Sequence, residues 1–262
     1  MSLWYDDVGP YHMGQNFKKF GAPRWCGMDN EELFNKNMSD AAARKRMERL
    51  GWTDPETITY SFNHQGFRSE EFDDRPAGVA LGCSHTMGTG NRLEQTWPWV
   101  LAELQGMHVW NLGVGASGLD TNLRLLDHYI KVLRPRFVVH AVPSVGRFEF
   151  FADDKWLCVV PAHRHAELEA LRSYINEYYL YDENSEMNAR RNLLAIQYLC
   201  LSRNIPYFAL DVNQSMDTTD SSARDLSHPG PVQQRIFAEA MHDLMRHNPQ
   251  GALDGHTRIR CS

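Results

Sequence analysis

The sequence lacks the features that mark membrane-spanning and nucleic-acid-binding proteins. Its apolar runs, such as residues 79–81 and 137–139, are far shorter than the roughly 18 residues that a membrane-spanning helix needs. It has no excess of basic charge, because 27 Lys and Arg stand against 33 Asp and Glu and give a net charge of −6. No block of like charge interrupts the chain. We therefore expect neither a membrane nor a nucleic acid as partner.

Cysteine is sparse and shows no paired spacing. There is no C-x-x-C pattern, and an odd number of cysteines cannot all pair within one chain; the five are Cys26, Cys83, Cys158, Cys200 and Cys261. This usage favours a reducing compartment or indifference to redox state. The start of the chain carries acids, Asp6 and Asp7, where a secretory signal has basic residues and then an apolar stretch. We expect a cytoplasmic protein, with a virion or signal-independent export as alternatives.

Apolar residues are plentiful enough for a sizeable core, at 42% of the chain with 11% aromatic. A length of 262 residues suits one elaborated domain. Residues 1–76 are polar and rich in Gly, Asn, Asp and aromatics, with one helical stretch near residues 40–50. We interpret them as an extension packed on a main domain formed by residues 77–262.

From residue 78 onward, short apolar runs alternate with segments of helical periodicity. The predicted strands are 78–83, 107–112, 136–142 and 206–211. The predicted helices are 97–104, 119–133, 165–180, 187–202 and 231–246. Strands alternating with helices predict a parallel sheet covered on both faces.

Several side chains of these elements are expected in the core. In the last helix we expect an inward stripe of Ile236, Phe237, Ala240, Met241 and Leu244. Among the tryptophans, we expect burial of Trp97, Trp99 and Trp110. His140 lies within an apolar strand, which favours a hydrogen-bonded core histidine over a ligand.

Ligands of such sheets bind beyond the carboxyl ends of the strands, so the strand-to-helix turns are the places to search. Ser84 follows the first predicted strand directly. At a helix N-terminus, exposed amides and the helix dipole favour developing negative charge beside such a serine. The alternative is that Ser84 is only an N-cap.

The second strand ends in a glycine-rich turn, residues 111–118, which has three glycines within six residues. Such a turn can present its N–H groups outward and suits an oxyanion hole or a phosphate site. A tight strand-to-helix connection would need the same residues.

Asp225 and His228 lie just before the last helix. A carboxylate and an imidazole three residues apart on a turn can share a hydrogen bond that fixes the ring tautomer and leaves the other nitrogen as a base. The alternative is a surface histidine ahead of a helix that begins at Pro231.

In this order, the three segments resemble the SGNH (GDSL-type) hydrolase family. Residues 82–86 match its nucleophile block, with Cys83 where many members have Asp, and residues 111–116 match its second block, with Ala116 where the family usually has Gly. Asp225 and His228 match its Asp-x-x-His block. Residues 60–68 and 96–98 also resemble bacterial and phage members, and the whole resemblance covers roughly residues 60–246.

The resemblance implies a three-layer α/β/α sandwich with a flavodoxin-like parallel sheet. It assigns Ser84 as nucleophile, His228 as general acid and base, and Asp225 as the carboxylate that orients the histidine. It also implies an oxyanion hole formed by the amides of Ser84 and of Gly115 or Ala116.

The third block departs from the family pattern of Gly-x-Asn-Asp. Residues 139–147 contain no asparagine, and Ser144 lies nearest to the missing one as a candidate third hole donor. Loss of a hole donor typically lowers the rate about a hundred- to a thousand-fold. Either Ser144 compensates, another donor does, or the enzyme is slow.

Other polar residues offer weaker alternatives. His163 and His165 are either a solvated helix end or metal ligands, His85 either lines the nucleophile pocket or flanks it at the surface, and Asp211 is another possible site acid. No metal or organic cofactor is implied.

The resemblance implies an esterase acting on small acyl esters, such as an O-acetyl group on a carbohydrate, through an acyl-serine intermediate. Two alternatives stay open. One is an inactive glycan-binding domain, and the other is an acyltransferase that passes the acyl group to a sugar hydroxyl. The oligomeric state is left open.

Overall fold

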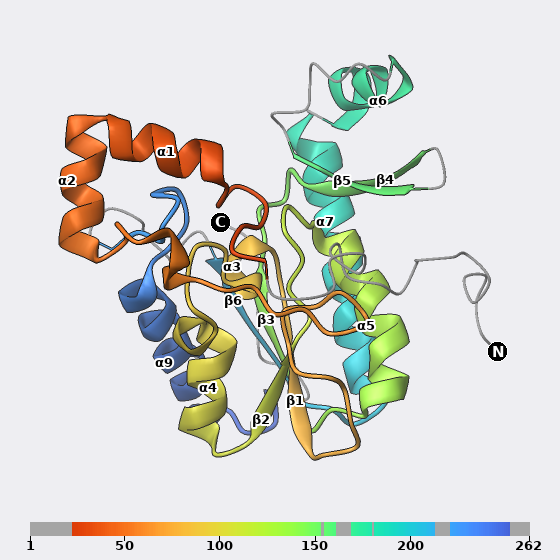
Figure 1. Cartoon of the computed structure of the whole chain (residues 1–262). Coiled ribbons are helices and arrows are strands. Elements are labelled where there is room, and N and C mark those ends of the chain that lie inside the picture. The colour runs from red at the N-terminus through yellow and green to blue at the C-terminus, as the bar shows by residue number, and fades with distance from the viewer. Residues whose placement is uncertain (1–22, 153–154, 161–168, 180, 213–220, 252–262) are drawn as a thin grey trace.

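The computed structural model describes residues 23–152, 155–160, 169–179, 181–212 and 221–251 (Figure 1). Its centre is a four-stranded parallel sheet in the order β2-β1-β3-β6. The strands are β1 (Ala77–Leu81), β2 (His108–Asn111), β3 (Val138–Val142) and β6 (Tyr207–Asp211). Every residue of β1 and β3 is buried, because helices cover both faces of the sheet.

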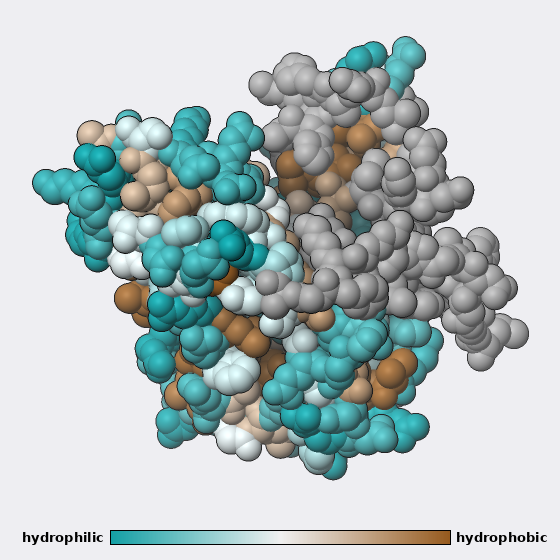
Figure 2. All heavy atoms as spheres, viewed as in Figure 1, coloured by the Kyte–Doolittle hydropathy of each residue, from teal (hydrophilic) through white to brown (hydrophobic). Residues whose placement is uncertain are grey.

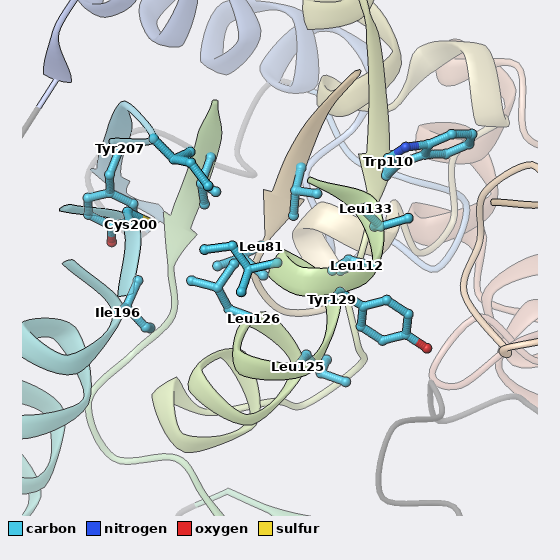
Figure 3. Close-up of a cluster of buried hydrophobic side chains, with 14 of the residues drawn as sticks. Leu81, Trp110, Leu112, Leu125, Leu126, Tyr129, Leu133, Ile196, Cys200 and Tyr207 are labelled. Carbon is cyan, nitrogen blue, oxygen red and sulfur yellow. The ribbon is translucent and has the colours of Figure 1, made fainter. Parts of the chain in front are cut away.

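Two pairs of helices form the outer layers, which confirms the predicted α/β/α sandwich (Figure 1). One pair is α4 (Trp97–Gln105) with α9 (Pro231–His247), and the other is α5 (Leu119–Leu133) with α7 (Asp182–Leu201). Alternate residues of β1 enter different cores: Val79 and Leu81 contact the α5 and α7 side, and Ala80 the α4 and α9 side. Figure 3 shows the first of these cores, in which Leu126 lies beside Leu81, with Leu125 and Ile196 in the same cluster.

The predicted inward face of the last helix is confirmed at Phe237 and Met241 but wrong at Ile236 and Ala240, which are exposed, and Leu244 is only half-buried. Ile236 is 48% exposed, and the buried side chains are Gln234, Phe237, Ala238, Met241 and Met245. The reason is Gln234, whose side-chain amide is buried. Its oxygen accepts from the Trp97 backbone N–H at 2.8 Å, and its nitrogen donates to the His85 carbonyl at 3.1 Å. Because this polar residue belongs to the buried face, the buried face is rotated relative to the face predicted from the apolar residues alone.

The tryptophan predictions are confirmed at two positions and wrong at the third. Trp97 and Trp110 are fully buried. Trp99 is 37% exposed, and its indole N–H donates to Glu103 at 3.2 Å, so it lies on the outer side of α4.

The described part of the expected N-terminal extension contains two helices, α1 (Glu31–Ser39) and α2 (Ala41–Leu50), and the 3-10 turn η2 (Pro55–Thr57). The helical stretch near residues 40–50 is therefore confirmed, whereas α1 was not predicted. Hydrophilic side chains lie along the outer edge of these helices (Figure 2). Their apolar side chains, including Phe34 and Met47, form a cluster with Met87.

A hairpin that the sequence analysis did not predict follows β3. It consists of β4 (Phe148–Ala152) and β5 (Lys155–Val159), paired antiparallel. The next described elements are α6 (Glu169–Tyr174) and a π-helical turn, η5 (Ile175–Tyr179), so the described part of the helix predicted at 165–180 is helical, and residues 165–168 and 180 lie outside the described residues. The helix predicted from residue 187 begins at Asp182.

The beginning and the end of the described chain are joined by a buried ion pair. Arg224 donates from Nε to Asp29 Oδ1 at 2.9 Å and from Nη2 to Asp29 Oδ2 at 2.7 Å, and both side chains are almost completely buried. The Tyr60 hydroxyl donates to the same carboxylate at 2.5 Å and accepts from the Gly90 N–H at 2.8 Å. Three segments far apart in the sequence therefore meet at Asp29.

No helix among the described residues is long and apolar enough to cross a membrane. None of the four cysteines that the structure describes, Cys26, Cys83, Cys158 and Cys200, takes part in a disulfide.

We predict that Asp29→Ala lowers the free energy of unfolding by about 3–5 kcal/mol, because it leaves the Arg224 guanidinium buried and unpaired. Urea denaturation followed by circular dichroism measures the change. The exposed Asp74→Ala is the matched control, with an expected effect within about 0.5 kcal/mol. Equal stability of the two variants would show that the ion pair contributes nothing.

Candidate active site

Ser84 is the first residue of α3 (Ser84–Met87), the short helix that follows β1. The chain turns at Gly82, whose φ is +149°. A Cβ there would lie 2.1 Å from Thr86 Oγ1 and 2.8 Å from the Ala141 carbonyl oxygen, so only glycine fits. The N-cap is Cys83, so the alternative interpretation of Ser84 as an N-cap is wrong.

Hydrogen bonds to backbone N–H groups hold the Asp225–His228 turn in place. Asp225 Oδ1 accepts the N–H groups of Ser227 and His228, each at 3.0 Å, in an Asx-type turn. The Ala223 N–H donates to the His228 carbonyl at 2.9 Å, and the Arg224 N–H donates to the Gly90 carbonyl at the same distance. The second bond ties the turn to the segment that follows α3.

The structure brings Ser84, His228 and Asp225 together in one chain of hydrogen bonds. His228 Nδ1 lies 2.5 Å from Asp225 Oδ2, and His228 Nε2 lies 2.9 Å from Ser84 Oγ. Asp225 is buried, and the His228 side chain is 13% exposed. The imidazole thus has one nitrogen on a carboxylate and the other on a hydroxyl, the arrangement in which it can take the hydroxyl proton.

The carboxylate of this chain is held in its ionised form. Burial acts to raise the pKa of Asp225, but the hydrogen bond and charge of His228 and the two backbone N–H groups outweigh it and leave the pKa below its ordinary value. Asp211, the other acid considered, lies at the end of β6, and the carboxylate that bonds to His228 is that of Asp225.

The glycine-rich loop packs against the turn that carries Ser84. The Val114 N–H and the Ser117 hydroxyl both donate to the Gly82 carbonyl, at 3.1 and 3.0 Å. A Cβ on Gly113 would lie 2.4 Å from the Met87 nitrogen, which shows how closely the two backbones approach. Gly115 lies next along this anchored loop and is partly exposed.

Ala116 adopts a left-handed conformation, with φ of +62°. This conformation costs an L-residue roughly 1–2 kcal/mol and costs glycine almost nothing. The backbone geometry therefore favours glycine at position 116, and alanine adopts it only with some strain.

Ser144 lies on the segment that joins β3 to β4 and is partly exposed. The Tyr179 hydroxyl donates to the carbonyls of Val145 and Arg147 in this segment, at 3.3 and 3.0 Å. A Cβ on Gly118 would lie 2.4 Å from the Arg147 carbonyl oxygen, so the segment lies against the start of α5. The role of Ser144 as a hole donor stays a prediction.

His85 lines the site, which decides between the two roles considered for it. Its ring meets that of His228 edge to face, with centroids 5.6 Å apart. Burial first, and then the charges of His228 and Arg147, lower its pKa to about 3, so this ring is neutral at neutral pH.

His140 is a hydrogen-bonded core residue, as predicted. Its Nδ1 lies 2.8 Å from the Tyr207 hydroxyl, and its Nε2 lies 2.9 Å from Asn122 Oδ1. The Asn122 amide reaches towards Ser117 Oγ and the Gly82 carbonyl, both at 3.5 Å. This buried network therefore lies directly beneath the glycine-rich loop.

The structure adds residues that no local pattern indicated, above all Arg224 and Asp29, which hold the histidine turn in place. No group of three or more His, Cys, Asp or Glu side chains within the described residues is arranged to hold a metal ion. His163 and His165 lie outside the described residues.

Comparison with known proteins gives matches among solved structures alone, since no family model and no curated protein matches. Esterase EstA from Pseudoalteromonas sp. is 13% identical, with 67% of this chain and 98% of that chain covered and a TM-score of 0.36. AlinE4, an SGNH-hydrolase family esterase, is 16% identical, with 72% and 83% covered and a TM-score of 0.34. The salicylyl-acyltransferase SsfX3 is 17% identical, with 69% and 57% covered and a TM-score of 0.36.

We predict that the buried His140 makes the protein less stable in mild acid. Burial lowers its pKa to about 3 in the folded state, against about 6.5 in an unfolded chain, so only the unfolded chain takes up the proton between these values. Above about pH 6.5 the histidine is neutral in both states, and the free energy of unfolding is unaffected. Below about pH 6.5 this free energy falls by about 1.4 kcal/mol per pH unit, because only the unfolded chain takes up the proton.

Urea denaturation between pH 7.5 and pH 5 tests this. Asp120, whose pKa burial raises to about 6, acts in the opposite direction, so the informative quantity is the difference between variants. His140→Gln should flatten the pH dependence below pH 6.5, and the exposed His247→Gln should leave it nearly unchanged. Parallel curves for wild type and His140→Gln would contradict the prediction.

Proposed function

We propose that this protein is a serine hydrolase of carboxylic esters, with Ser84 as nucleophile, His228 as general acid and base, and Asp225 as the carboxylate that orients the histidine. Its main support is the unbroken hydrogen-bond chain from Asp225 through His228 to Ser84, which joins residues 144 positions apart in the sequence. A structural role alone would not require a buried carboxylate, an imidazole and a hydroxyl in this order.

In the first half of the reaction, Ser84 Oγ attacks the ester carbonyl carbon while His228 Nε2 takes the hydroxyl proton. Asp225 keeps the ring oriented and offsets the charge of the imidazolium. The tetrahedral oxyanion is stabilised by the amide N–H of Ser84, which as a first helical residue has no acceptor within its helix, and by that of Gly115 or Ala116. Ser144 is a further candidate donor.

The intermediate then collapses, and His228 returns the proton to the departing alcohol oxygen, which leaves an acyl-Ser84 ester. Water attacks this ester with His228 as base and releases the carboxylic acid. No step requires a metal or an organic cofactor. The substrate class that the family resemblance implies is a small acyl ester, such as an O-acetyl group on a carbohydrate.

Ser84→Ala is expected to lower esterase kcat by at least about a thousand-fold and to leave the fold intact, because binding and the oxyanion hole survive the loss of the nucleophile. Hydrolysis of 4-nitrophenyl acetate measures the rate, and a fluorophosphonate probe measures covalent capture. Ser202→Ala, at an exposed helix end, is the matched control with unchanged rate and labelling.

More than about a tenth of wild-type activity in Ser84→Ala would exclude it as the nucleophile. A wild-type protein that neither turns over esters nor takes the probe would favour an inactive glycan-binding domain. Transfer of the acyl group to an added sugar, in place of its release as acid, would favour an acyltransferase.

We further expect His228→Ala to be nearly as damaging as Ser84→Ala, and Asp225→Asn somewhat milder, since Asp225 acts through the ring. The double variant Ser84→Ala, His228→Ala should be little worse than either single variant, because the members of one catalytic unit are not additive. Wild-type kcat/KM should fall in acid as His228 becomes protonated and can no longer accept the serine proton. Losses that multiply would show that Ser84 and His228 act independently.

A further inference from the structure

Arg147 carries a buried guanidinium nitrogen with no partner. Among the described residues, nothing accepts a hydrogen bond from its Nη1, although that atom is shielded from solvent. Folded proteins pair nearly all buried polar atoms, and an arginine, which keeps its charge, is the most costly to leave unpaired. Arg147 as a whole is partly exposed, but its Nη1 is buried and unpaired, and this atom points to a ligand that supplies the acceptor.

The main chain of Arg147 is anchored against the end of the glycine-rich loop. Its carbonyl is held by the Tyr179 hydroxyl at 3.0 Å and abuts Gly118 at the end of the glycine-rich loop. Asn188 in turn donates to that hydroxyl at 3.3 Å. The main chain of Arg147 is therefore anchored before any ligand arrives, which lowers the entropy cost of binding.

His85 supplies a second unpaired atom at the same place. Its Nδ1 is buried and has no hydrogen-bond partner in the part of the chain that the structure describes, and its ring lies against that of His228. The charge of Arg147 is one of the causes that lower the His85 pKa, so the two side chains are electrostatic neighbours. A neutral imidazole whose Nδ1 carries the proton can donate to an anion.

The carboxylates around this place are already engaged. Asp225 is bonded to His228, and Glu149 forms a buried ion pair with Arg124. Asp120 accepts the backbone N–H groups of Glu149 and Thr121. Among the described residues, no acid forms an ion pair with Arg147, and these three carboxylates are engaged elsewhere.

We propose that Arg147 and His85 form an anion-binding subsite beside Ser84, and that the ester substrate carries a carboxylate. The proposal rests on the proposed esterase function and narrows its substrate class to monoesters of dicarboxylic acids or esters of hydroxy acids. A guanidinium fork binds a carboxylate with directed, charge-assisted hydrogen bonds. The opposing role for Arg147 is that of the missing third oxyanion-hole donor, which would assist every ester equally.

Matched pairs of esters separate the two roles and locate the anion. The first pair, 4-nitrophenyl hemisuccinate and 4-nitrophenyl butyrate, places the charge on the acyl side. The second pair, 4-acetoxybenzoate and its methyl ester, places it on the alcohol side. We expect wild-type kcat/KM to favour the anionic member of at least one pair about tenfold or more.

Arg147→Gln should lower the ratio of anionic to neutral kcat/KM about tenfold to a hundredfold, and Arg147→Lys, which keeps the charge without the fork, should lower it less. Arg235→Gln, an exposed arginine on α9, is the matched control with an unchanged ratio. An equal loss on both members of each pair would overturn the subsite in favour of an oxyanion donor. A wild type with no preference in either pair would also overturn it.

Binding of a carboxylate tests the subsite independently of catalysis. If no ester is hydrolysed, that result counts against the proposed esterase function and not against the subsite. The melting temperature of Ser84→Ala is measured with succinate or 4-hydroxybenzoate at millimolar concentration and constant ionic strength. Stabilisation that the added change Arg147→Gln removes supports the subsite. Absence of stabilisation by both carboxylates, or stabilisation that survives Arg147→Gln, overturns it.

Discussion

The arrangement of the candidate site depends on the buried ion pair between Arg224 and Asp29. The histidine turn comes from the end of the chain, and Asp29 from its beginning, 195 residues earlier. Removing two charges from water is costly, and such a pair is tolerated only when its remaining hydrogen bonds are satisfied. Here Arg224 also donates to the carbonyls of Pro55 and Arg24, and Asp29 also accepts from Tyr60. The N-terminal segment thereby holds the residue next to Asp225, and so positions the imidazole over Ser84.

Close backbone approach is the second constraint. The turn at Gly82 and the loop at Gly113 leave no room for a Cβ. The Gly82 carbonyl accepts the hydrogen bonds that anchor the glycine-rich loop. The His140 network supports the same carbonyl from below through Asn122. These contacts hold Ala116 in its left-handed conformation, which a loop without such contacts would leave for a less strained one.

Sequence reasoning succeeded where the determining interactions are local. The strands are continuous apolar runs because both faces are covered, and Asp225 and His228 are three residues apart on one turn. It failed where the cause lies elsewhere in the chain. The buried face of α9 depends on the contact of Gln234 with Trp97, 137 positions away, and nothing near Asp29 in the sequence indicates Arg224. The β4–β5 hairpin was also missed, since its two short strands stabilise each other and pack outside the main sheet.

Charge balance links the reaction to the identity of its substrate. In the proposed reaction, His228 becomes a cation when it takes the serine proton, in a region where the charge of Arg147 already lowers the pKa of the neighbouring His85. Asp225 offsets one positive charge, and its buried carboxylate is already bonded to the His228 ring and to the backbone N–H groups of Ser227 and His228. A neutral ester would leave the imidazolium and the guanidinium to repel each other in a site of low dielectric constant. In the proposed subsite, an anionic group on Arg147 would remove that repulsion during the proton transfer, so the contact that binds the substrate would also favour the reaction.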